Sequence, residues 1–165
     1  LIFRHPHVFG DVKVGSSHDV ETNWEKIKLK EKGGNRTVLA GVPAALPALI
    51  KADRIQEKAA NVGFDWESRD DVWDKVGEEQ REVREAVASG ERDAIEAEFG
   101  DLLFSVVNAA RLHGVNPENA LERTNRKFIS RFNYIEEVAR RQGRAISELT
   151  LAEMDALWNE AKAQM

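Results

Sequence analysis

The chain has 165 residues, of which 42% are hydrophobic and 32% are charged, a balance typical of a globular domain with its own core. The net charge of −5, with no dominant basic block, argues against a general nucleic-acid partner. Cysteine is absent and no apolar run approaches the roughly 20 residues of a membrane span, so we expect a cytoplasmic protein without disulfides, zinc–thiolate sites or a membrane partner.

The first forty or so residues have an irregular pattern. The first residue is Leu1, not Met, and it lies in an apolar stretch, which we interpret as a fragment whose natural N-terminus is missing. Pro6 breaks any early helix, and residues 23–32 read as a short charged helix that ends at Gly33-Gly34. The segment from there to Pro43 is predicted to be a loop or linker.

After Pro47 the apolar residues recur at the spacing of an α-helix, and no segment has the pattern of a strand. A first helix is expected up to Gly63. A second helix is expected to begin with Ser68 as its N-cap and to end at Gly90. The tryptophans near this second helix, Trp66 and Trp73, are assigned to the core.

The third and fourth helices follow with short connections. The third ends near Gly114, and Asn116-Pro117 starts the fourth, because proline is favoured at the first position of a helix. Thr150 and Glu153 form a capping-box pattern at the start of the last helix. The pattern predicts an all-α fold, an antiparallel four-helix bundle with a further C-terminal helix, stabilised by dimerisation. The residues expected on the inner face of the fourth helix are Leu121, Phe128, Phe132, Ile135 and Val138.

Two acidic motifs interrupt the apolar stripes of the second and third helices: Glu78-Glu79-Gln80-Arg81-Glu82 and Glu98-Phe99-Gly100-Asp101. Helical spacing places the second and last acids of the first motif on one face, and likewise the two acids of the second motif. Carboxylates that converge from two antiparallel helices repel one another unless cations lie between them. Hard divalent ions such as Mg²⁺ take oxygen ligands of this kind and share them with phosphate substrates. The motifs therefore indicate metal-assisted phosphate chemistry.

Competing interpretations remain open on the residues alone. Glu-rich stretches are commonly solvated helix faces. On the residues alone, this interpretation is as well supported as metal binding. A di-iron storage or redox bundle also uses inward-facing acids, but it relies on Glu-x-x-His pairs, which the sequence lacks. Lys127 and Arg131, four residues apart, could present two cations to a triphosphate, although an exposed charged face is the commoner role for such a pair. For Trp158 the default expectation is core packing.

The two acidic motifs also carry a resemblance to a known family. The runs from Lys75 to Glu82 and from Glu98 to Phe104 resemble the MazG family of nucleoside triphosphate pyrophosphohydrolases, whose signature is E-E-x-x-E, a variable spacer, then E-x-x-D. The similarity extends over about residues 40–163. Bacterial members that this chain resembles carry two tandem copies of the domain. The resemblance thus implies that 1–39 is the tail of a preceding repeat plus linker and that 40–165 is a complete catalytic domain.

The resemblance implies roles for individual residues. The ligands of two or more Mg²⁺ ions, with Mn²⁺ as a substitute, would be Glu79, Glu82, Glu98 and Asp101. The positions that line the nucleotide site would be Lys75, Glu78, Glu79, Ala94, Ile95, Glu96, Ala97 and Asp101. The contacts to phosphate or nucleotide from the end of the chain would be Lys127, Arg131 and Trp158.

The reaction implied is hydrolysis of a nucleoside triphosphate between the α- and β-phosphates, in a homodimer. Metal-activated water would attack the α-phosphate and release nucleoside monophosphate and pyrophosphate. Glu78 lies beside the expected ligands, and it is the candidate for orienting or deprotonating that water. A non-catalytic module that binds nucleotide or mediates dimerisation is the alternative function.

Overall fold

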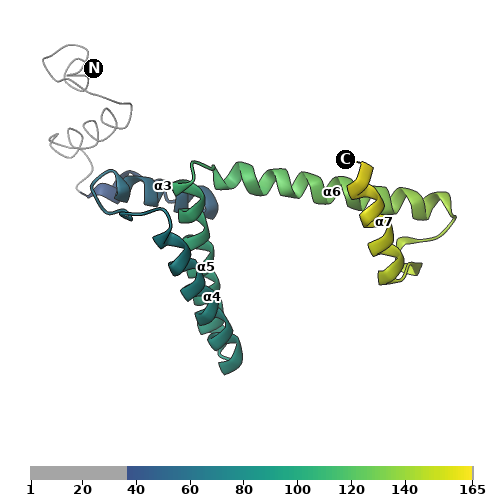
Figure 1. Ribbon diagram of the computed structural model, residues 1–165, viewed down its shortest axis with the longest axis horizontal. Helices are drawn as coiled ribbons and strands as arrows, with labels where there is room; N and C mark the ends of the chain where they lie inside the picture. Colours follow the sequence, from purple (N-terminus) through teal and green to yellow (C-terminus); the bar gives the residue numbers. More distant parts are fainter. Residues whose placement is uncertain (1–36, 165) are drawn as a thin grey trace, which may run out of the picture. The chain divides into compact units, whose positions relative to one another are not determined.

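The computed structural model describes residues 37–164, and this part of the chain consists of helices, turns and connecting segments without a strand (Figure 1). The helices are α3 (Ala48–Ala60), α4 (Asp71–Ser89), α5 (Arg92–Leu112), α6 (Pro117–Arg141) and α7 (Leu151–Gln164), and the 3₁₀ turns are η2 (Val38–Gly41) and η3 (Ile146–Glu148). The all-α prediction is confirmed. The expected helix at 23–32 and the tail of a preceding repeat lie outside the described residues.

The chain divides after Pro117 into two compact units. In the first unit, α4 and α5 lie side by side and run antiparallel (Figure 1). The turn between them is short because Gly90 adopts a left-handed backbone conformation, with φ of 76°, and its N–H donates to the carbonyl of Ala86. α3 packs against α5. The buried apolar residues of this unit are Val72, Val83, Ala86, Val107 and Ala109.

The start of α4 differs from the prediction. The helix begins at Asp71, with Asp70 as its N-cap residue. Ser68 does not cap it, since the Ser68 hydroxyl accepts the N–H of Asp70 at 3.2 Å and so closes the preceding turn. The acidic side chains of Asp71 and Asp74 lie in the first helical turn, where the N-terminal end of the helix dipole favours them.

The second unit contains α6 and α7. Its buried centre is formed by Ile135 and Ala139 of α6 together with Leu149, and the residues that pack against them are Ile146, Met154, Leu157 and Trp158. The predicted capping box is confirmed, because the backbone N–H of Thr150 donates to the Glu153 carboxylate at 2.7 Å and the Thr150 hydroxyl accepts from the Glu153 N–H at 3.3 Å.

Several residues expected in the core are exposed. On α6, Ile135 is buried, but Leu121 and Phe128 are 52% and 57% exposed, and Phe132 is 36% exposed. Trp73 is 52% exposed, and its indole Nε1–H donates to Nε2 of His113 at 3.2 Å, which gives the ring a polar partner at the surface. Trp66 is exposed as well. These apolar residues lack cover within their own unit, and closure of the helices into a bundle stays a prediction.

Candidate active site

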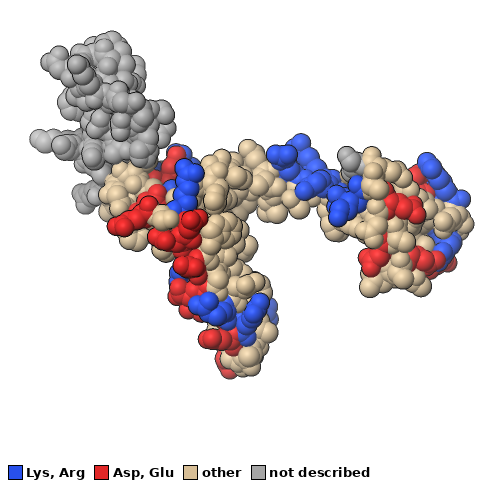
Figure 2. Space-filling view, in the orientation of Figure 1, with Lys and Arg blue, Asp and Glu red and all other residues tan. Residues whose placement is uncertain are grey.

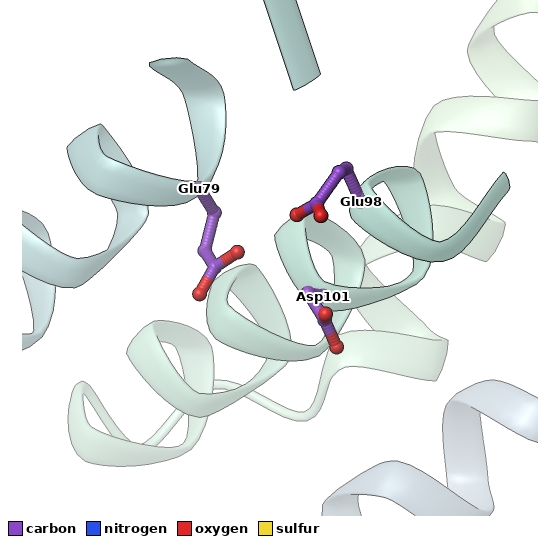
Figure 3. Close-up of side chains that lie close together, drawn as sticks. All are labelled: Glu79, Glu98 and Asp101. Atoms are coloured by element: carbon purple, nitrogen blue, oxygen red, sulfur yellow. The ribbon is translucent and has the colours of Figure 1, made fainter. Parts of the chain in front are cut away.

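The short α4–α5 connection brings the two acidic motifs together. Glu79 on α4 and Glu98 and Asp101 on α5 each offer a carboxylate oxygen, and these three oxygens lie within 4.8 Å of one another. Figure 3 shows Glu79 reaching from α4 toward the two acids of α5. Antiparallel helices with a two-residue connection leave these side chains facing each other, as the spacing of the motifs predicts. The cluster could hold a metal ion.

Glu79 is the acid whose surroundings fit a cation best. It is only 5% exposed, and its Oε1 accepts a hydrogen bond from the Lys75 ammonium at 2.7 Å. Its Oε2 is buried with no hydrogen-bond partner among the described residues. A buried carboxylate oxygen without a donor is costly, and hard divalent cations prefer oxygen ligands of this kind. The donor set and this unpartnered oxygen therefore fit a hard divalent cation.

Contacts with this cluster raise the pKa of two neighbouring side chains on α4. Hydrogen bonds to the Glu79 and Glu78 carboxylates raise the pKa of Lys75. Burial, followed by contact with the Glu79 carboxylate, raises the pKa of Glu82, which lies one turn further along α4. Glu82 is not one of the three acids within 4.8 Å of one another. The structure thus brings three of the four predicted ligands together and leaves the fourth beside Glu79.

The other predicted residues of the first unit lie near the cluster. Glu78 accepts a hydrogen bond from Lys75 at 3.0 Å and is half-buried. The stretch Ala94 to Ala97, which includes Ile95 and Glu96, forms the first turns of α5 directly before Glu98, and most of it is exposed. In Figure 2 the acidic side chains gather along α4.

A cavity of about 800 Å³ borders the acids. Lys75, Glu79 and Asp101 line it, together with residues of η2, of α3, of the α3–α4 connection, of the start of α4 and of the C-terminal half of α5. Gln56 is the uncharged polar residue buried most deeply in this lining, at 6% exposed. The sequence analysis missed it, although a glutamine between Ile55 and Ala59 on the buried side of α3 was the available signal.

The second unit carries the predicted cations. The guanidinium of Arg131 lies 5.3 Å from the centre of the Trp158 ring, and Phe128 contacts the same tryptophan at 5.1 Å between ring centres. Nε of Arg131 is buried without a hydrogen-bond partner in the described part of the chain. Lys127 lines a cavity of about 420 Å³ together with Arg123 and Arg126, and Figure 2 shows basic side chains gathered along α6.

Residues 68–136 match the MazG nucleotide pyrophosphohydrolase domain, a range that contains both acidic motifs. The chain is 45% identical over 163 residues to the nucleoside triphosphate pyrophosphohydrolase/pyrophosphatase MazG of Thermotoga maritima, covering 98% of this chain and 61% of the relative. It is 41% identical over 167 residues to the nucleoside triphosphate pyrophosphohydrolase of Escherichia coli K12, covering 98% and 63%. Nearly the whole chain is thus similar to members of the MazG family.

A third relative is the uncharacterized protein YabN of Bacillus subtilis, which is 50% identical over 164 residues. The match covers 98% of this chain and 34% of YabN. The chain thus spans about 60% of the length of the named pyrophosphohydrolases. The similarity to them reaches beyond the matched domain to α3 and α7, because it covers nearly all of this chain. Within the described residues, no helix is both long and apolar enough to cross a bilayer.

Proposed function

We propose that the chain hydrolyses nucleoside triphosphates at the α–β phosphate bond with Mg²⁺, releasing nucleoside monophosphate and pyrophosphate. The observation that carries this proposal is the convergence of Glu79, Glu98 and Asp101, in which the buried Glu79 Oε2 lacks a partner among the described residues. The relatives from T. maritima and E. coli are named as nucleoside triphosphate pyrophosphohydrolases, which supports the same chemistry here.

Four acids would hold the metal: Glu79, Glu82, Glu98 and Asp101. When bound, Mg²⁺ would neutralise phosphate charge and lower the pKa of a coordinated water, and Mn²⁺ would be a substitute. Lys75 is charged at neutral pH, and its hydrogen bonds to Glu79 and Glu78 raise its pKa further, so that it can offset charge beside the acids.

Glu78 would act on the attacking water. One of its oxygens accepts the Lys75 ammonium at 3.0 Å, which fixes the carboxylate beside the metal ligands. The other oxygen can then accept a proton from water, as general-base catalysis requires. The first turns of α5, residues 94–97, would contact the nucleotide just before Glu98.

Lys127 and Arg131 would bind phosphate. Both cations lie on α6, one helical turn apart, and the Arg131 guanidinium is held over the face of Trp158. In this arrangement Trp158 supports the arginine, and an aromatic ring fixes the guanidinium plane before an anion arrives.

Exposed apolar residues on α5 support a proposal for the assembly. Phe99, Leu103 and Val106 lie on one side of α5 at helical spacing and are each more than two-fifths exposed. We propose that a second copy covers this face in a homodimer, in which 40–165 is one catalytic domain and 1–39 belongs to a preceding repeat. The compartment would be the cytoplasm, where nucleoside triphosphates are made and used. Light scattering at micromolar concentration would test the dimer, and a monomer would contradict it.

The reaction is tested with a panel of canonical and damaged nucleoside triphosphates and Mg²⁺, with products separated by chromatography. Monophosphate plus pyrophosphate is the expected pair of products. Diphosphate plus phosphate would refute cleavage at the α–β bond. Binding without any Mg²⁺-dependent product would favour a non-catalytic nucleotide-binding module.

A further inference from the structure

Three cations form a row along α6 in the second unit. Arg123, Lys127 and Arg131 follow one another at intervals of four residues, so they share one face of the helix. Neighbours in this cationic row lie about 6 Å apart along the helix axis, and the whole row spans about 12 Å. Like charges at this spacing repel each other and destabilise a helix. A bound anion would remove that repulsion.

The other arginines of α6 are paired with acids of the same helix. Arg126 contacts Glu122 at 2.7 Å, and Arg140 and Arg141 both contact Glu137, at 2.6 and 2.8 Å. By contrast, no acid stands three or four residues from any member of the cationic row, so none of the three can form such a pair within α6. The cations of α6 that lack an acidic partner on this helix are therefore those that share one face.

Both ends of the cationic row have features that suit an anion. At the first end, Arg123 and Lys127 are exposed and line the cavity of about 420 Å³, which leaves room for a ligand between them. At the other end, the guanidinium of Arg131 lies over the ring of Trp158, 5.3 Å from its centre. A guanidinium held over an aromatic face keeps N–H donors in its own plane for phosphate oxygens. These features favour an extended anion along α6.

We propose that the cationic row binds a linear phosphate chain and that Arg123 contacts the phosphate most distant from Arg131. The inference rests on the proposed function, in which Lys127 and Arg131 bind phosphate, and it adds Arg123 as a residue that selects the length of the chain. Because the row spans about 12 Å, a pyrophosphate group meets two of its cations, whereas a triphosphate reaches all three. Arg123 thereby favours nucleoside triphosphates over diphosphates.

The test measures the dissociation constants of inorganic tripolyphosphate and pyrophosphate by calorimetry, without divalent ions. In the unaltered chain, tripolyphosphate should bind more tightly than pyrophosphate. Arg123→Met should weaken tripolyphosphate binding by about tenfold, the effect of losing one charge-assisted hydrogen bond, and should change pyrophosphate binding by less than about twofold. Arg123→Lys, which keeps the charge but not the planar fork, should lose less. Arg140→Met removes the same charge from the same helix, and as the matched control it should leave both constants near their original values.

Two results would overturn the inference: equal weakening of both anions by Arg123→Met, or tripolyphosphate that binds no more tightly than pyrophosphate to the unaltered chain. An effect of Arg140→Met as large as that of Arg123→Met would do the same. With Mg²⁺ and ATP, Arg123→Met should raise KM by about tenfold and leave kcat nearly unchanged. Tripolyphosphate binding that depends on Arg123, without pyrophosphate release from ATP, would refute the proposed function alone. Pyrophosphate release with a KM that Arg123→Met does not alter would refute the role of Arg123 alone.

Discussion

The two units of this chain hold opposite charges by different means. In the first unit, the backbone sets the acids: a short turn at Gly90 makes α4 and α5 antiparallel, and Glu79 then faces Glu98 and Asp101. In the second unit, a side-chain contact sets the cation, since Arg131 rests on the ring of Trp158. The positions of the acids therefore depend on the α4–α5 turn, whereas the position of the Arg131 guanidinium depends on the Trp158 side chain.

Removal of an acid should produce the largest effect. Glu79→Ala is expected to lower kcat by about three orders of magnitude or more, because a metal ligand contributes several kcal/mol to the reaction. Helix content should not change, since the α4–α5 turn does not involve this side chain. The measurement is Mg²⁺-dependent pyrophosphate release, with circular dichroism alongside.

Two further variants sharpen this result. Asp101→Ala should cause a comparable loss, and Glu85→Ala, an exposed acid on the same helix, should leave activity near its original value. Mg²⁺ should raise the unfolding temperature of the unaltered chain but not that of Glu79→Ala. Retained turnover in Glu79→Ala would remove the metal assignment from this cluster.

The next largest effect is expected from a core substitution that should destabilise the second unit and not the first. Ile135 is 3% exposed in the centre of the second unit, so Ile135→Ala should lower the free energy of unfolding by about 2–5 kcal/mol. Hydrogen exchange should accelerate in α6 and α7 and change little in α4 and α5 if the units open separately. Ile129→Ala, at an exposed position on the same helix, is the control. Equal acceleration in both units would show that they unfold as one.

A smaller effect is expected from the aromatic support of Arg131. Trp158→Leu should raise KM for nucleoside triphosphate by up to about tenfold and leave kcat nearly unchanged, because cation–π contacts contribute about 0.5–2 kcal/mol. Trp158→Phe should restore part of the loss, since its ring still presents a π face. A fall in kcat with KM unchanged would place Trp158 in the chemical step instead.

The smallest effect concerns the start of α7. Hydrogen bonds from Arg144 and from the backbone and hydroxyl of Thr150 lower the pKa of Glu153 to about 2. A lowered pKa in the folded state means that this stabilisation is complete above the ordinary carboxyl range and is lost as the pH falls toward 2. Urea unfolding at pH 5 and pH 3 should therefore show a destabilisation by Arg144→Met that is larger at pH 5. Lys162→Met is the control, and an equal difference at both values would contradict the assignment.

The sequence predicted most of the helix boundaries and the acidic cluster. Both depend on local features: glycine after a helix, proline at its start, a capping box, and acids at helical spacing on consecutive helices. Ser68 was assigned wrongly because its hydroxyl can accept from either of two neighbouring turns, and composition does not distinguish them.

Burial and the cavity could not be predicted in the same way. Helical periodicity shows that Leu121, Phe128 and Trp73 share an apolar pattern, but it does not show whether another element covers them. The buried side chain of Gln56 donates a hydrogen bond to the carbonyl of Phe104, which lies 48 residues further along the chain. Long-range pairings of this kind depend on the packing of α3 against α5, which the periodicity of either helix does not contain.

Lys75 has one more consequence. Its ammonium lies 2.7 Å from Glu79 and 3.0 Å from Glu78, and those two hydrogen bonds raise its pKa. Lys75 therefore acts as a counter-ion within α4, one helical turn before the two acids that it contacts. Under the proposed function, a metal ion that binds the acids would meet a cluster whose charge Lys75 has already neutralised in part.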